Sequence, residues 1–353
     1  MAALKIESGR LNWVLFNQST IRAELYNNAA DAVSAADGSR IGQKVILPST
    51  FIGSQRAMHA RYQDAMAIVR VKGKPDLFIT VTCNPNWPEI VRELLPGQVA
   101  ADHSELTADV FELKLRQILK EINELGIFGR KVAVMDVIEF QQRGLPHAHL
   151  LLILAPEDKF KTADDIDAAV SAEVPEDPVL REKVVRCGML HNLCGTNNPG
   201  APCMKDGVCS KGFPKDFQFS TEMTDDAMPL YRRRSPADGG LTVSLPNGKT
   251  FDNRSVVPYS PHLLLRFDCH INVEICNSVK CVKYLYKYIY KGGDRSMVRD
   301  DVEGEPRNEV REYQDVRSIG ACEAAWKIYG FEMSHSLPAV VALQVHLDGD
   351  QVM

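Results

Sequence analysis

Apolar residues recur along the chain with two periods, and these periods predict most of its regular structure. Residues 53–75 carry apolar side chains at helical spacing behind Ser54, a suitable N-cap, and predict an amphipathic helix. Residues 107–126 have the clearest helical stripe, with Thr107 as a candidate cap and Gly126 as a candidate end. Shorter helical patterns occur in two further segments, 1–50 and 318–331.

Other segments have the composition of strands. Residues 75–85, PDLFITVTCNP, are rich in β-formers and end at Asn-Pro, which predicts a buried strand. Residues 131–154 hold two such runs around QQRGLP and predict a hairpin. Residues 239–261 predict a second hairpin around an Asn-Gly turn, and residues 262–276 predict one or two more strands. The chain shows no internal repeats.

Length and composition place the chain among soluble globular proteins. Its 353 residues are 45% hydrophobic and 25% charged, and they suffice for two domains or one large domain with insertions. No apolar run approaches the ~20 residues of a membrane-spanning helix, and the N-terminus lacks the apolar core of a signal peptide. We therefore expect an intracellular protein with no membrane partner. Nine cysteines then favour thiols or metal ligands over disulfides.

The net charge of −5 hides a strong segregation of charge along the chain. Residues 155–183 are acid-rich and have the pattern of a surface insertion with helical propensity. Residues 280–299 carry six basic side chains against the single acid Asp294, and Arg232–Arg234 form a second basic knot. Because local fields govern contacts with nucleic acids, the total charge does not exclude a nucleic-acid partner.

His147 and His149 are the first candidates for chemistry. Residues i and i+2 of a strand point to the same face, so the two imidazoles project together. Glu139 ends the preceding strand, and antiparallel pairing can bring it beside them. Two imidazoles and a carboxylate suit Mg²⁺ or Mn²⁺ on a phosphate oxygen, or a catalytic Zn²⁺. Asp136 and Gln141 are the alternative ligands.

A tyrosine-rich stretch, YLYKYIYK, spans residues 284–291 and permits two interpretations. As a strand, it would place its four tyrosines on one face; as a helix, it would place Tyr284 and Tyr288 one turn apart with Lys287 and Lys291 beside them. Composition alone leaves the two even. A tyrosine aligned behind a metal-polarised phosphodiester could form a 5′-phosphotyrosine link and free a 3′-hydroxyl.

Cysteines gather in a turn-rich segment, residues 187–217. The spacing fits a small zinc knuckle with one histidine and three cysteines as ligands, namely His191, Cys194, Cys203 and Cys209. Cys187 is an alternative to His191, and reduced, partly buried thiols are the alternative to zinc. The remaining cysteines are expected at core positions, and His270 could support the histidine pair or contact DNA.

Taken together, three segments resemble a known family. FITVT at 78–82, PHAHLLL at 146–152 and YLYKYIYK at 284–291 resemble motifs one, two and three of the HUH endonucleases, the nucleases that initiate rolling-circle replication. Further segments are similar to the Helitron helicase-like N-terminal region of rolling-circle transposons: 58–90, 202–217 and 267–292. The resemblance covers roughly residues 50–345, and it is the combination of motifs that makes it specific.

This resemblance implies an α+β fold with a central antiparallel sheet of about five strands, flanked by helices in the manner of an RRM or ferredoxin-like core. It implies His147, His149 and Glu139 as metal ligands, and Tyr284 and Tyr288 as helical nucleophiles with Lys287 between them. It also implies single-stranded DNA as partner and a nuclear location. The expected DNA-binding residues are Lys280, Lys283, Lys291, Arg295 and Trp87.

The implied organisation has three parts: a helical segment over 1–50, a nuclease domain over 51–300 that includes the acidic and cysteine-rich insertions, and a helical extension over 301–353. Longer relatives carry a fused Pif-type helicase. Because this sequence holds no phosphate-binding loop, we expect a fragment, a separate domain or a decayed copy. The rival hypotheses are an inactive DNA-binding relic and a two-histidine metal hydrolase without a covalent step.

Overall fold

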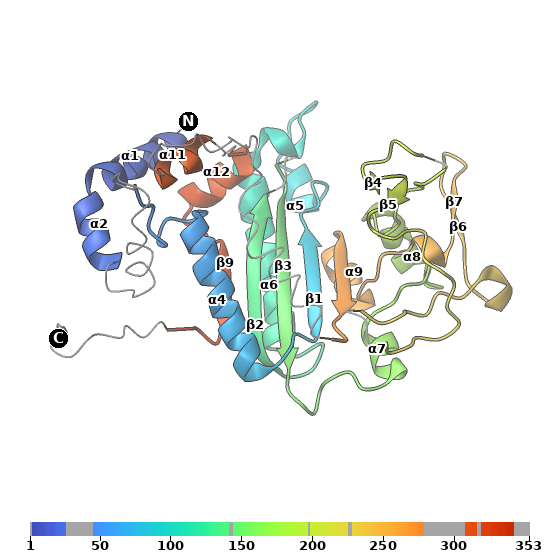
Figure 1. The fold of residues 1–353 in the computed structure, drawn as a ribbon. Helices are drawn as coiled ribbons and strands as arrows, with labels where there is room; N and C mark the ends of the chain where they lie inside the picture. The colour runs from blue at the N-terminus through green and yellow to red at the C-terminus, as the bar shows by residue number, and fades with distance from the viewer. Residues whose placement is uncertain are drawn as a thin grey trace.

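One antiparallel sheet of five strands organises the protein. The computed structural model describes residues 2–25, 45–140, 144–196, 198–224, 228–278, 308–315 and 319–341. In this part of the chain the sheet has the order β8-β1-β3-β2-β9 (Figure 1). Its strands are β1 Leu77–Thr82, β2 Lys131–Phe140, β3 Pro146–Leu154, β8 Ile271–Ile275 and β9 Ser334–Leu337. The predicted α+β class with a central antiparallel sheet is therefore confirmed.

Four of the strands follow the ferredoxin-like order. Helix α6, Ser104–Asn123, lies between β1 and β2, and helix α9, Pro261–Phe267, comes directly before β8. The succession is strand, helix, strand, strand, helix, strand, and the spatial order is fourth, first, third, second. Strand β9 adds a fifth strand beside β2, so the segment 301–353, expected as a helical extension, also extends the sheet.

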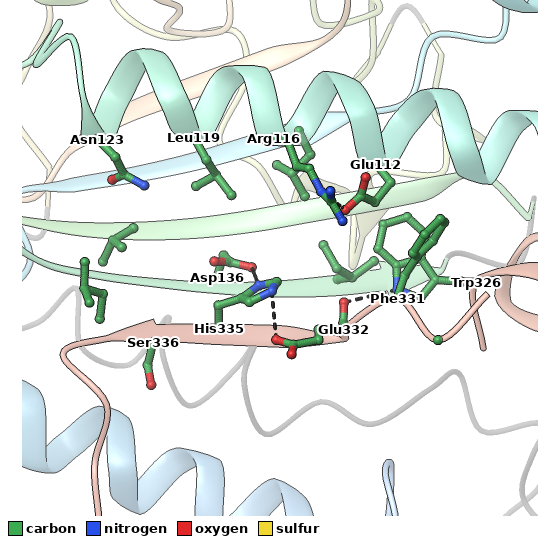
Figure 2. Close-up of a pocket in the computed structure, with 15 residues that line it drawn as sticks. Glu112, Arg116, Leu119, Asn123, Asp136, Trp326, Phe331, Glu332, His335 and Ser336 are labelled. Carbon is green, nitrogen blue, oxygen red and sulfur yellow. Dashed lines mark hydrogen bonds and ion pairs between the residues drawn. The ribbon is translucent and has the colours of Figure 1, made fainter. Parts of the chain in front are cut away.

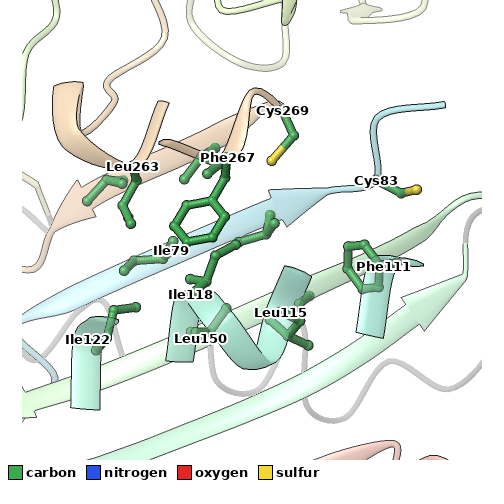
Figure 3. Close-up of a cluster of buried hydrophobic side chains, with 14 of the residues drawn as sticks. Ile79, Cys83, Phe111, Leu115, Ile118, Ile122, Leu150, Leu263, Phe267 and Cys269 are labelled. Carbon is green, nitrogen blue, oxygen red and sulfur yellow. The ribbon is translucent and has the colours of Figure 1, made fainter. Parts of the chain in front are cut away.

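One face of the sheet forms the main core with α6 and α9. Alternate residues of the strands, such as Ile79 and Leu150, point to these helices (Figure 3). Helix α6 contributes Ile118 and its neighbours one turn away, and α9 contributes Phe267. Strand β3 is buried along its whole length because both of its faces are covered.

Helix α4, Gln55–Lys72, packs on part of the opposite face. Its Ala65 and Ile68 contact a smaller cluster that includes Met135 and Leu151 of the sheet. Ser54 caps this helix as predicted, with its hydroxyl oxygen accepting from the Ala57 amide at 3.0 Å. On β2 and β3 the apolar positions of this face lie toward one end of the strands, and Glu139, His147 and His149 lie toward the other end.

One helix boundary and one element type differ from the prediction. Helix α6 begins at Ser104, and the Thr107 hydroxyl donates to the carbonyl of His103 at 3.0 Å inside the first turn, so Thr107 is not the cap. Residues 262–276 form α9 followed by β8, where the sequence suggested only strands. Pro261 opens α9 at a position that requires no amide donor, and Leu263, Leu264 and Phe267 recur at helical spacing.

The helices near the two ends of the described chain pack together (Figure 1). Helices α1, Ala2–Phe16, and α2, Gln18–Leu25, confirm the short helices expected in residues 1–50. Leu11 of α1 and Val310 of α11, Glu309–Asp315, share a buried cluster, and Tyr313 donates to Glu7 at 2.7 Å. Helix α12, Ala321–Ile328, confirms the helix expected over 318–331. Within the described residues, no helix has the length and apolarity to cross a bilayer.

A separate lobe is inserted between β3 and α9, on the β8 side of the sheet (Figure 1). Its own small core combines Val184, Met189 and Tyr259 with Leu264 of α9. The expected hairpin of residues 239–261 is present as β6 and β7. The lobe and the β1–α6 connection contain these further elements: α5 Pro88–Val91, η1 Ala100–Asp102, α7 Ala163–Ala169, α8 Pro178–Arg186, β4 Met204–Lys205, β5 Val208–Cys209, η2 Pro236–Asp238, β6 Val243–Ser244, β7 Thr250–Phe251 and η3 Asn253–Ser255.

Candidate functional site

His149 and Glu139 lie side by side on the sheet face that packs against α4, at the end of the strands where polar residues occur. In the β2–β3 register, Glu139 lies opposite His147, and Val137 lies opposite His149. The Oε2 atom of Glu139 is 3.1 Å from Nε2 of His149. The hairpin thus places both imidazoles and the carboxylate on one face, as strand alternation predicts.

The hydrogen bonds behind the imidazoles orient them. Nδ1 of His147 lies 3.1 Å from the carbonyl oxygen of Leu145, which can only accept, so this nitrogen carries the proton and the lone pair of a neutral ring is on Nε2. Nδ1 of His149 lies 3.1 Å from the hydroxyl of Thr80, which can donate or accept. Such bonds fix the ring orientation that a metal ligand needs.

The donor set fits a divalent cation. Neighbouring ligands of an octahedral ion bound at 2.0–2.1 Å lie about 3 Å apart, close to the 3.1 Å between Glu139 and His149. The side chains of His149 and Glu139 are only 9% and 11% exposed, so they are held among other protein groups. Glu139 and His149 could therefore serve as neighbouring ligands of one cation in the geometry that they already have.

His270 and Asn272 extend this polar face. The amide of Thr82 donates to the His270 carbonyl, and Thr80 is paired with Asn272. His270 and Asn272 therefore lie in line with the histidine pair. Burial, followed by the neighbouring His147, lowers the pKa of His270 to about 4, which keeps its ring neutral. Nδ1 of His270 and Oδ1 of Asn272 are buried without a hydrogen-bond partner among the described residues.

Sequence reasoning did not single out Thr80 or Asn272. Thr80 occupies the middle of FITVT, and its position could have been found from strand alternation, because Phe78, Thr80 and Thr82 must share one face. Asn272 carried no comparable signal, since its strand is adjacent to β1 only in the folded sheet.

Asp136, the alternative ligand, lies on the opposite face. It is paired with Leu150, and its carboxylate is 2.9 Å from Nδ1 of His335 (Figure 2). It lines a pocket of about 570 Å³ between α6 and β9. Asp136 is therefore wrong as the alternative ligand, because residues three apart on a strand point to opposite sides and the histidines share the face of Glu139.

The prediction that Trp87 binds DNA is also wrong. Its side chain is 1% exposed and lies within the main core, where its indole nitrogen donates to the Phe267 carbonyl at 2.8 Å. The ring packs against Phe111, 6.5 Å between centroids. A base cannot stack on an indole whose faces are already covered, so Trp87 is a core residue.

The basic knot at 232–234 is structural. Arg233 is 4% exposed, and its Nη1 donates to the carbonyls of Asn253 and Val256 at 2.6 and 2.7 Å. Arg234 binds Glu173 at 2.7 Å, and Arg232 binds Asp167 at 2.9 Å. These carboxylates neutralise the exposed arginines, so the knot adds little positive field.

The four predicted knuckle ligands come together in the inserted lobe. Ligand atoms of His191, Cys194, Cys203 and Cys209 all lie within 4.8 Å of one another, and they are the one such cluster found in the described chain. Cys187, the alternative to His191, lies apart, with its thiol 3.5 Å from Asp268. Burial, followed by Asp268, raises the pKa of Cys187 to about 12.

Several predicted residues lie outside the described residues. They are the tyrosine stretch and its basic neighbours, together with one alternative ligand: Tyr284, Lys287, Tyr288, Lys280, Lys283, Lys291, Arg295, Cys281 and Gln141. Their roles stay predictions from the sequence.

The fold and the polar face define a ferredoxin-like α+β protein with two histidines and a glutamate together on one face of its sheet. Residues 1–152 match the family model described as the Helitron helicase-like domain at the N-terminus. This match supports the relation to Helitron proteins indicated by the motifs, and it includes Thr80, Glu139 and both histidines. No curated protein matches the chain.

Proposed function

We propose that this protein is a single-stranded DNA endonuclease and strand transferase of a Helitron-type transposon. The observation that carries the proposal is the placement of His147, His149 and Glu139 on one sheet face, with Glu139 3.1 Å from His149. The family match over residues 1–152 supports a relation to Helitron proteins, and this face would supply the chemistry.

The chain's own residues would hold and orient the scissile phosphate. A Mg²⁺ or Mn²⁺ ion bound there would polarise a phosphate oxygen and neutralise developing charge. The Leu145 carbonyl holds His147 with the lone pair on Nε2, Thr80 orients the ring of His149, and Glu139 supplies the negative charge. Buried atoms of His270 and Asn272 offer further polar contacts at the same end of the sheet.

The proposed nucleophiles are Tyr284 and Tyr288. The phenolic oxygen forms a bond to phosphorus, the bond to O3′ breaks, and the leaving O3′ takes up a proton. This gives a 5′-phosphotyrosine link and a free 3′-hydroxyl, and the second tyrosine allows a return transfer. Lys287 is proposed to favour the phenolate and to contact the phosphate.

The reach of the chain supports this assignment. Strand β8 ends at Ile275, two strands away from β3 and at the far end from the histidines. That path is roughly 15 Å from strand spacing and rise. Tyr284 comes nine residues after Ile275, and nine residues can span up to about 30 Å. The tyrosines are therefore within reach of the histidine pair.

The deciding experiment uses a single-stranded oligonucleotide labelled at its 3′ end. The protein is incubated with this oligonucleotide and Mn²⁺ and analysed on a denaturing protein gel. We expect a labelled covalent adduct that is absent from the Tyr284→Phe/Tyr288→Phe double variant and from His149→Ala. The matched control is Tyr286→Phe, a change of the same kind in the same stretch, which should keep the adduct.

The same experiment separates the rival functions. Cleavage without a covalent adduct would indicate a two-histidine hydrolase in which the tyrosines are packing residues. DNA binding without cleavage would indicate an inactive relic. Loss of the adduct in Tyr286→Phe to the same extent as in the double variant would refute the assignment of the nucleophiles.

A further inference from the structure

The inserted lobe contains a second set of metal-ligand side chains, far from the sheet face in the fold. His191 follows α8, Cys194 lies three residues later, and Cys203 and Cys209 flank the β4–β5 hairpin. The hairpin pairs Met204 with Cys209, which brings the two cysteines side by side. We propose that these four residues bind one structural Zn²⁺ ion, a site independent of the proposed nuclease function.

The distances agree with tetrahedral zinc. Tetrahedral Zn²⁺ bound at 2.3 Å by sulfur and at about 2.0–2.1 Å by nitrogen would hold these two atom types roughly 3.6 Å apart. Nε2 of His191 lies 3.7 Å from the sulfur of Cys194 and 3.5 Å from that of Cys209. The whole set spans no more than 4.8 Å, which suits one ion, because a two-iron cluster would spread its ligands over two metals.

The surroundings of the ligands are built to hold them. The ring of Phe213 stacks on His191, with 4.3 Å between centroids and 13° between planes, and this fixes the imidazole plane. The sulfur of Cys194 lies 3.7 Å from the Phe213 carbonyl oxygen, so the same residue contacts two of the four proposed ligands.

The segment also needs a stabilising element of this kind. Among the described residues between 191 and 217, the buried apolar side chains are those of Cys194 and Ala201. So little apolar burial cannot offset the loss of chain entropy on ordering a turn-rich stretch. A metal ion that binds the folded state provides that free energy directly.

Cys187 provides a matched internal comparison. It lies in the same lobe and is buried, but its sulfur contacts Asp268 and belongs to a different cluster. A serine at this position keeps a donor for Asp268. Cys187→Ser therefore tests the effect of removing a thiol from the lobe without touching the proposed ligands.

The experiment measures zinc in the purified full chain by elemental analysis, for the wild type, Cys209→Ser, Cys203→Ser and Cys187→Ser. We expect about one zinc per chain in the wild type and in Cys187→Ser, and at least about a fivefold loss in the two ligand variants, because three-ligand sites bind zinc far more weakly. Substoichiometric zinc in the wild type, or an equal loss in Cys187→Ser, would overturn the proposal.

A second measurement does not depend on a variant that folds. Wild-type protein is stripped with a chelator under reducing conditions and titrated with Co²⁺. We expect the visible bands of tetrahedral Co²⁺ with thiolate charge-transfer absorption, saturating at one ion per chain. Protease cleavage between residues 191 and 217 should increase after stripping and fall again on zinc addition. An octahedral cobalt spectrum, or a disulfide between the same cysteines in reducing buffer, would contradict the proposal.

Discussion

The hydroxyl oxygen of Thr80 lies 3.1 Å from Nδ1 of His149, across two neighbouring strands of the sheet. The other ring nitrogen of His149 faces Glu139. Thr80 therefore acts on the proposed metal only through His149, as a positioning residue.

Thr80→Val should weaken the apparent affinity for Mn²⁺ in the nicking reaction by about 10–100-fold, the usual effect of losing such a partner. The rate at saturating Mn²⁺ should fall much less. Thr80→Ser keeps the hydroxyl and should remain near the wild type. The measurement is the Mn²⁺ dependence of nicking; an equal loss of maximal rate in both variants would argue against a positioning role.

Trp87 should matter for stability and not for DNA binding. Trp87→Ala should lower the free energy of unfolding by about 3–5 kcal/mol, because it empties a fully packed core position. Trp87→Phe should cost less and should bind single-stranded oligonucleotides as the wild type does. Urea unfolding and fluorescence anisotropy measure the two effects. A loss of affinity in folded Trp87→Phe, with Trp13→Phe as the exposed control, would restore a stacking role.

Arg233 and Arg232 should respond differently to the same truncation. Arg233→Ala removes a buried guanidinium that donates to the Asn253 and Val256 carbonyls, and should cost about 3 kcal/mol of unfolding free energy. Arg232→Ala removes a side chain that is 40% exposed and pairs with Asp167. It should lower the free energy of unfolding by at most about 1 kcal/mol. Urea unfolding of both variants tests this, and equal costs would contradict the structural assignment.

His335 should make the attachment of β9 depend on pH. Its hydrogen bond to the buried Asp136 raises the pKa of the imidazole, and burial opposes that effect. A raised folded pKa means that the stabilisation is complete below the unfolded pKa of about 6.5 and is lost as pH rises through the folded pKa. Glu332 on the other side of the ring acts in the same direction (Figure 2).

His335→Gln should therefore be less stable than the wild type near pH 5.5 by at most about 1 kcal/mol, since the ring is half exposed and screened by solvent. The difference should vanish near pH 9, and it should shrink in high salt. Urea unfolding at the two pH values measures it. A difference that grows with pH would show that the imidazolium is not the stabilising form.

The elements with the strongest periodicity were predictable from the sequence. Helix α4 follows its apolar stripe and its Ser54 cap, and the β2–β3 hairpin follows its two β-rich runs. The same local geometry places His147 and His149 on one face. The sequence was also sufficient to exclude Asp136 as a metal ligand, because strand alternation places it on the opposite face of β2 from Glu139.

The spacing of the cysteines and His191 selected the ligand set, but only the fold of the lobe showed that Cys187 points elsewhere. Residues 262–267 became helical where β-propensity suggested a strand, since their apolar side chains pack onto α6 through the main core. Tertiary burial overrides a weak local preference of this kind.

By itself, the sequence determined which side chains share a face of each helix or strand, because that depends only on the local repeat of the backbone. Tertiary structure alone decided which faces meet. It buried Trp87 under α6, paired β1 with both β3 and β8 so that Thr80 and Asn272 join the histidines, and added β9 beside β2. These contacts join residues far apart in the chain, and they form where the whole molecule can bury apolar surface and satisfy polar groups together.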